Sequence, residues 1–192
     1  MDVPMADVPI DGRCFAYVFP CRWEDHCKIG FSRDPLGRIA ALHPRWYEFF
    51  DLERGVLVEA ESVRDARDLE LLLREPLRDH NAPAPLSVRM EAGGGTEWFR
   101  GVETLLDVAV RGLATQGYRL LPLQAWLGAA LAARRDGLHE WTLLQLSVDE
   151  LEGLCGDTPA QRRLRDQLDA FDALWIDIDD VLPRTVRDWY RR

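Results

Sequence analysis

The chain has 192 residues, of which 47% are apolar and 30% charged, a balance that supports one buried core beneath a charged surface. Its formal net charge is −9, with 13 basic and 18 acidic residues in 1–101 and 11 basic and 15 acidic residues in 102–192. Neither half has the basic excess that phosphate binding favours, which argues against a strong nucleic-acid binder. No apolar run approaches the ~20 residues of a transmembrane helix, so we expect no membrane partner.

The N-terminal segment 1–12 is acidic and lacks the apolar centre of a secretory signal, so it is predicted to be a short disordered lead. The spacing of Cys14, Cys21 and Cys27 fits no common zinc motif, and Cys155 lies far away. Two of these cysteines fall in or beside an apolar strand, where a cysteine behaves as a small hydrophobe. We therefore expect buried, reduced thiols and a cytoplasmic location.

A predicted β-hairpin and a capped helix follow this lead. The segment 14–20 (CFAYVFP) is rich in aromatic residues and predicts a strand, and 26–32 (HCKIGFS) predicts its returning partner. Asp34 is a typical N-cap and Pro35 a typical first helical residue. Their helix is expected to end near His43, just before the next proline.

The rest of the first hundred residues predicts one more strand and one long helix. The strand covers 51–60, and a serine-capped helix covers 62–80. A flexible glycine loop is predicted at 91–95, and 97–99 (EWF) is a short extended segment. The fold class is therefore α+β, with a small antiparallel sheet flanked by helices in a domain over 13–101.

Residues 102–192 predict a C-terminal all-helical region. Leu105 and Val108 have helical spacing, a leucine repeats every four residues over 123–131, and Ser147 begins a capping box. This region is acidic and has neither a zinc finger nor an evident helix-turn-helix motif. Its apolar side chains and tryptophans indicate packing partly on the first domain and partly on a protein partner or a second copy.

Tyr17 and Lys28 are the first candidate pair. Lys28 is the single lysine among 24 basic residues, which is either chance or a chemical requirement, since a lysine pKa shifts readily on burial. If residues of the two strands pair with an odd sum of residue numbers, both side chains lie on one face, opposite or diagonal to each other. A nearby ammonium would lower the tyrosine pKa and make it a general base; the alternative is a surface tyrosine beside a solvated lysine.

Glu70 is the second candidate, because it falls within the apolar stripe of the 62–80 helix. A core-facing carboxylate is costly unless it binds a metal or pairs with a cation such as Arg38. Arg38 itself flanks the apolar side of the preceding helix. Its guanidinium either donates two hydrogen bonds to a phosphate or lies over the protein surface, exposed to solvent. His43, at the end of that helix, either orients a water or caps the helix.

These motifs in this order resemble the GIY-YIG endonuclease superfamily. They are Ala16-Tyr17-Val18, then Lys28-Ile29-Gly30-Phe31-Ser32, then Asp34-Pro35 with Arg38, then Glu70, then Glu97-Trp98-Phe99. More narrowly, the chain is similar to the phage-type branch that carries KIG as its second motif and a late EWF. Lys28 stands where better-known members have a second tyrosine, and their late asparagine has no clear counterpart.

The resemblance implies a divalent-metal-dependent endonuclease that hydrolyses DNA. It implies that Tyr17, helped by Lys28, activates a water and that Arg38 holds the scissile phosphate. His43 lies near a position that helps the attack in the family, although it is offset, and Gly30 supports the site. Glu70 would bind one Mg²⁺ or Mn²⁺.

In the last motif, EWF, Glu97 either supports the site or closes the sheet. The two aromatic residues that follow it are expected to lie in the core. The alternative function is a catalytically silent module of the same fold that binds or regulates protein partners. The acidity of the chain and the missing asparagine favour this alternative, whereas the presence of Tyr17, Lys28, Arg38 and Glu70 together favours cleavage.

Overall fold

The computed structural model describes residues 13–92 and 95–192. The predicted disordered lead, 1–12, lies outside the described residues, as do residues 93–94 of the glycine loop. The chain forms two compact units, the first ending at Leu127 and the second beginning at Gly128. No helix in the described ranges has both the length and the hydropathy to span a bilayer. The fold is α+β, as the sequence predicts.

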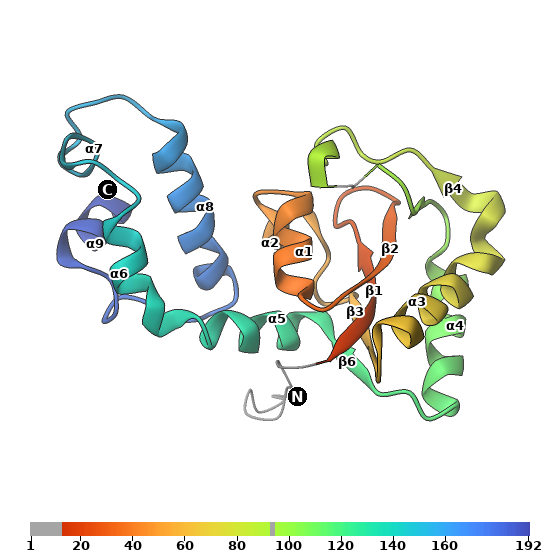
Figure 1. Cartoon of the computed structure of the whole chain (residues 1–192). Coiled ribbons are helices and arrows are strands. Elements are labelled where there is room, and N and C mark those ends of the chain that lie inside the picture. The colour runs from red at the N-terminus through yellow and green to blue at the C-terminus, as the bar shows by residue number, and fades with distance from the viewer. Residues whose placement is uncertain (1–12, 93–94) are drawn as a thin grey trace. The chain divides into compact units, whose positions relative to one another are not determined.

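The first unit is organised around a six-stranded open sheet in which neighbouring strands are antiparallel (Figure 1). The spatial order of the strands is β4-β5-β2-β1-β3-β6. In chain order they are β1 (Cys14–Pro20), β2 (Cys27–Ser32), β3 (Val56–Ala60), β4 (Asn81–Ala82), β5 (Trp98–Phe99) and β6 (Leu120–Pro122).

The β1–β2 hairpin has the odd-sum register that the pairing of Tyr17 with Lys28 required. Tyr17 is opposite Gly30 and Phe19 is opposite Lys28, so each pair of residue numbers has an odd sum. Because strands alternate faces, these four residues share one face of the sheet, and Tyr17 and Lys28 are diagonal neighbours. The third strand is shorter than predicted: residues 51–55 form a turn, which Asp51 stabilises by accepting the backbone N–H of Arg54.

The opposite face of the sheet packs against α3 (Val63–Arg74) and α4 (Glu103–Thr115) (Figure 1). Ser62 caps α3 as predicted, but the α-helix ends at Arg74 and continues as the 3₁₀ helix η2 (Glu75–His80). Pro76 lacks the N–H that an α-helix needs and its ring crowds the preceding turn, which explains the early end. The buried side chains of this layer include Ala16, Val18, Ile29, Leu69, Leu73, Leu106 and Leu113.

The Tyr17 face packs against two short helices, α1 (Pro35–Leu42) and α2 (Trp46–Phe49). Asp34 caps α1 through the backbone N–H of Gly37, as the Asp-Pro pair predicts, whereas α2 was not predicted. The 3₁₀ helix η3 (Met90–Ala92) follows later in the chain. The core here is aromatic, and the ring of Phe15 meets that of Trp126 edge to face at 5.4 Å.

The boundary expected near residue 101 falls inside the first unit. Residues after it supply α4, β6 and the start of α5 (Leu123–Ala132), so part of the helical region packs on the sheet domain, as expected. The buried face of α4 carries Leu106 and Leu113. Leu105 and Val108, whose spacing indicated this helix, are instead exposed.

The second unit is helical throughout the residues described. After the end of α5 it contains η4 (Arg135–Gly137), α6 (Leu138–Leu143), α7 (Val148–Glu152), α8 (Pro159–Ala173) and α9 (Arg184–Tyr190). The capping box predicted at Ser147 is present, and Thr158 begins a second one. Several large apolar side chains remain exposed on this unit, among them Leu144, Leu154 and Trp175.

Candidate active site

Tyr17 is fixed in the middle of β1 by its neighbours on the same face of the sheet. Its ring stacks on Phe19, with 4.0 Å between ring centroids and an angle of 8° between the planes. Across the hairpin lies Gly30, where a Cβ atom would be only 2.3 Å from the Tyr17 hydroxyl oxygen. The glycine of the KIG motif therefore leaves the space that the tyrosine ring fills.

The partner of the Tyr17 hydroxyl is Arg38 on α1. The Nε–H of Arg38 donates a hydrogen bond to the Tyr17 Oη, at a distance of 3.0 Å. Burial raises the pKa of Tyr17, and the positive charge and hydrogen bond of Arg38 offset only part of this effect. The pKa of Tyr17 is therefore raised and not lowered as expected, because burial outweighs the positive charge of Arg38.

Lys28 is buried in the sheet, with a relative exposure of 0%. Its ammonium Nζ donates to Glu97 Oε2 at 2.8 Å and also to the carbonyl oxygen of Thr96, and it lies 5.9 Å from the ring centroid of Trp98. Burial lowers the pKa of Lys28, while the hydrogen bond to Glu97 favours the charged form. Lys28 thus binds the segment that precedes β5, and the reading as a solvated surface lysine is wrong.

Glu97 has an unusual backbone conformation, with φ at 59° in the left-handed region that few residues other than glycine adopt. Its carbonyl oxygen accepts the N–H of Ile29 at 3.1 Å, which fixes the segment at the edge of β2. Burial alone would raise the pKa of Glu97, but the hydrogen bond from Lys28 and the charge of Arg74 hold it below its usual range. Such strain is maintained only where surrounding contacts impose it, and it often marks a functional position.

Glu70 is buried on α3, with a relative exposure of 6%, as its place in the apolar stripe predicts. Its Oε1 accepts a hydrogen bond from Arg74 Nη1 at 2.9 Å, one helical turn further on. The structure thus supplies Arg74 as the ion-pair partner, where the sequence suggested Arg38. Burial raises the pKa of Glu70 and the guanidinium of Arg74 opposes this rise.

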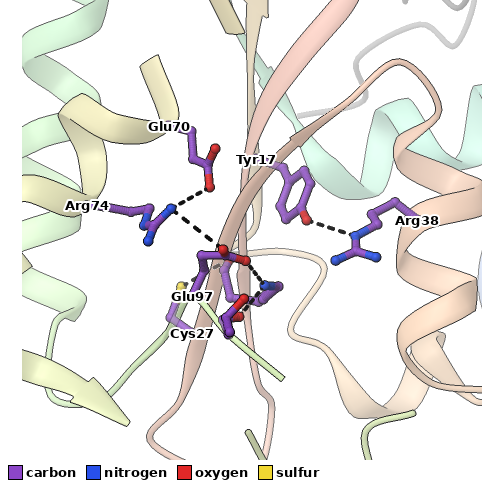
Figure 2. A network of polar contacts seen from close by, with 8 residues as sticks. Tyr17, Cys27, Arg38, Glu70, Arg74 and Glu97 are labelled. Atoms are coloured by element: carbon purple, nitrogen blue, oxygen red, sulfur yellow. Dashed lines mark hydrogen bonds and ion pairs between the residues drawn. The ribbon is translucent and has the colours of Figure 1, made fainter. Parts of the chain in front are cut away.

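Arg74 is the site residue that sequence reasoning missed, although its i+4 spacing from Glu70 was a usable signal. Its Nη1 also lies 3.7 Å from Glu97 Oε1, so one guanidinium faces two carboxylates. Lys28, Glu97, Arg74 and Glu70 thus form a chain of polar contacts, and Figure 2 shows Glu97, Arg74 and Glu70 with the Tyr17–Arg38 pair beside them. Glu97 therefore contacts both Lys28 and Arg74, in addition to its backbone bond to Ile29 of β2.

His43 lies at the end of α1, five residues after Arg38. It is the C-cap residue of α1, its Nδ1 accepts the backbone N–H of Arg45 at 3.1 Å, and its ring stacks on Phe49 at 4.4 Å. These contacts fit the helix-end alternative. A role in orienting water stays a prediction.

The candidate metal ligand is a single carboxylate. Within the described ranges, no group of three or more His, Cys, Asp or Glu side chains is arranged to hold a metal ion. Glu70 engages Arg74 through one oxygen, while its Oε2 forms no hydrogen bond in the described structure. This donor set fits Mg²⁺, which binds one or two carboxylates and takes its other oxygens from water and substrate phosphate.

The fold and the network together describe a small α+β domain with a polar site beside the central strands of its sheet. The model of the T5orf172 domain family matches residues 15–114, which include the network and more than half of the chain. The chain therefore belongs to the T5orf172 domain family, a nuclease-related family in the GIY-YIG-like group. Neither the curated proteins nor the solved structures contain a match to it.

Proposed function

We propose that this chain is a divalent-metal-dependent endonuclease of the GIY-YIG type that hydrolyses phosphodiester bonds in DNA. The observation that carries the proposal is the 3.0 Å contact between Arg38 Nε and Tyr17 Oη. It puts a phosphate-binding guanidinium directly beside a group able to accept a proton from water. Membership of a nuclease-related family supports the same conclusion.

Arg38 binds the scissile phosphate in this proposal. Its Nε is engaged by Tyr17, and a guanidinium presents further N–H donors in a plane that matches phosphate oxygens. The basic residues Arg33 and Arg45 flank α1, although the chain as a whole is acidic. Arg45 is itself paired with Glu48 at 2.6 Å, so the excess positive charge near Arg38 is small and the affinity for DNA is expected to be weak and salt-sensitive.

Tyr17 acts as the general base. In its phenolate form, Oη takes a proton from the attacking water while the water oxygen bonds to phosphorus and the bond from phosphorus to the leaving oxygen breaks. The contact with Arg38 stabilises the phenolate, whereas burial disfavours it. The base form is therefore a minority species at neutral pH, and it grows as the pH rises.

Glu70 would hold one Mg²⁺ or Mn²⁺ through its carboxylate. When bound, such an ion stabilises negative charge on the leaving oxygen. Lys28 positions Glu97, and Glu97 helps to hold Arg74 close to Glu70. Gly30 leaves the room that the ring of Tyr17 needs.

The second unit would bind a protein, which we propose to be a second copy of the chain. Leu144 is 84% exposed and Trp175 is 91% exposed, and both are large apolar side chains. Apolar and aromatic residues are typical of protein interfaces, whereas DNA-binding surfaces are basic. We also propose a cytoplasmic location, since Cys14, Cys21 and Cys27 are buried free thiols.

Incubation with DNA tests the proposal. The full chain is mixed with supercoiled plasmid or with single-stranded DNA, in the presence of Mg²⁺, Mn²⁺ or EDTA, and the products are separated on gels. We expect cleavage with either metal and none with EDTA. Retarded migration of intact DNA, without cleavage under any condition, would instead support the silent binding module.

A further inference from the structure

One guanidinium nitrogen lies between the two carboxylates of the network. Arg74 Nη1 is 2.9 Å from Glu70 Oε1 and 3.7 Å from Glu97 Oε1, and these carboxylates come from α3 and from the segment before β5 (Figure 2). A position between two carboxylates from separate elements is one that favours a cation. In this structure the protein's own side chain occupies it.

The charges in the network already balance. Glu97 is paired with Lys28 at 2.8 Å, and Glu70 is paired with Arg74 at 2.9 Å. A divalent cation added at Glu70 would therefore meet two positive groups and no uncompensated carboxylate. A cation bound to Glu70 would lie close to the guanidinium of Arg74. Because like charges repel strongly in a buried setting, the presence of the guanidinium beside Glu70 weakens the binding of the metal.

We propose that Arg74 is an internal competitor for the divalent cation, which occupies the position between Glu70 and Glu97 and keeps metal affinity low until its guanidinium moves away. The inference rests on the proposed function, because it takes Glu70 as the metal ligand. It assigns Arg74 a regulatory role at that ligand, distinct from the phosphate-binding role of Arg38.

The surroundings of Arg74 give the guanidinium somewhere to go. Its side chain is 32% exposed, in contrast to the 8% of the Glu70 side chain. It lines a cleft of about 520 Å³ together with Leu71, Arg78 and Asn81. A displaced guanidinium can therefore turn toward open space without disrupting the core on the other side of α3.

Binding of Mn²⁺ in the absence of DNA tests the inference. The full chain is titrated with Mn²⁺, and the free ion is followed by its electron paramagnetic resonance signal. The variants are Arg74→Gln, Glu70→Gln and the double variant. Arg78→Gln is the matched control, because Arg78 lies one turn further on, lines the same cleft and is 81% exposed.

We expect Arg74→Gln to bind Mn²⁺ about tenfold more tightly than the wild type, because the variant removes one positive charge within hydrogen-bond distance of the proposed ligand Glu70. Arg78→Gln should bind like the wild type, and the double variant should lose the gain. Equal affinity of Arg74→Gln and the wild type would overturn the inference, as would an equal gain in Arg78→Gln.

The outcomes also separate this inference from the proposed function. If the double variant binds Mn²⁺ as tightly as Arg74→Gln, the ion is not at Glu70, and the metal assignment fails together with the inference. If the wild type binds through Glu70 but Arg74→Gln binds no better, only the inference fails. Should Arg74→Gln unfold without metal, refolding on Mn²⁺ addition supports the competition, and failure to refold at millimolar Mn²⁺ contradicts it.

Discussion

Arg38 donates from its Nε to the hydroxyl oxygen of Tyr17 at 3.0 Å, and this contact joins the helix α1 to the central strand β1. The buried ring of Tyr17 has little freedom to move, because it stacks on Phe19 and covers Gly30. Arg38 therefore meets a hydroxyl whose position the sheet determines. A phosphate bound by this guanidinium would lie beside the phenol oxygen.

Gly30→Ala should displace Tyr17 and reduce cleavage strongly. The new Cβ would be 2.3 Å from the Tyr17 hydroxyl oxygen, and the stacked ring cannot move aside cheaply. We expect a loss of about 1–3 kcal/mol in the free energy of unfolding, measured by urea denaturation. Gly112→Ala is the control, since no atom lies within 4 Å of its added Cβ. An active and stable Gly30→Ala protein would show that Tyr17 need not hold this position.

Tyr17 should give cleavage a rising pH dependence. Because burial raises its pKa, the phenol is protonated at neutral pH, and the base form increases about tenfold per pH unit. Single-turnover rates should therefore rise by about one logarithmic unit per pH unit between about pH 7 and 9, and Tyr17→Phe should be slow at every pH. The folded protein holds the proton of Tyr17 more tightly than the unfolded chain does. The resulting stabilisation is present below about pH 10 and is lost as the pH rises above it. A wild-type cleavage rate that does not change with pH would show that Tyr17 is not the general base.

Lys28→Arg should destabilise the domain. Lys28 is fully buried, and a wider guanidinium cannot replace an ammonium that bonds both Glu97 and the carbonyl of Thr96. We expect the free energy of unfolding to fall by about 1–3 kcal/mol and activity to fall with it. The pH dependence of the remaining activity should stay as in the wild type, because Arg38 is the group that contacts the Tyr17 hydroxyl. A shift of the pH profile in Lys28→Arg would show that Lys28 does influence the pKa of Tyr17.

Much of the fold follows from local signals in the sequence. Asp34 and Ser62 cap the helices they were expected to cap, and the alternation along β1 and β2 puts Tyr17 and Lys28 on one face once the hairpin register has an odd sum. Glu70 is buried because it lies within an apolar helical stripe. Each of these features depends on a few neighbouring residues, so each can be predicted before the tertiary structure is known.

Other features depend on contacts between distant segments. Strand β6 has three residues and exists because it pairs with β3, and α2 is a single turn without a helical pattern. The pKa of Tyr17 was predicted with the wrong sign, because burial depends on the complete packing of the domain. The pairing of Arg74 with Glu97 joins residues on separate elements, so the i+4 relationship with Glu70 was only half of the signal.

Exposed apolar residues of the second unit should control association. We expect the full chain to form dimers in light scattering at micromolar concentration, and Leu144→Ser or Trp175→Ser to weaken the dimer by about tenfold or more, the effect of losing an interface anchor. Trp23→Ser is the control, since Trp23 is 82% exposed in the first unit. A wild-type monomer would contradict the proposed self-association, and equal weakening by Trp23→Ser would move the interface away from the second unit.

Cleavage by Glu70→Gln tests the central claim most directly. The amide has nearly the same shape as the carboxylate but is a poor ligand for a hard cation. Plasmid cleavage with Mg²⁺ is measured for the wild type and the variant, and the melting temperature of each is recorded in parallel. We predict that the variant keeps its fold and that its cleavage falls to the level of the wild type in EDTA. A clear loss of melting temperature with full metal-dependent cleavage would show that Glu70 is only the ion-pair partner of Arg74, and it would contradict the account.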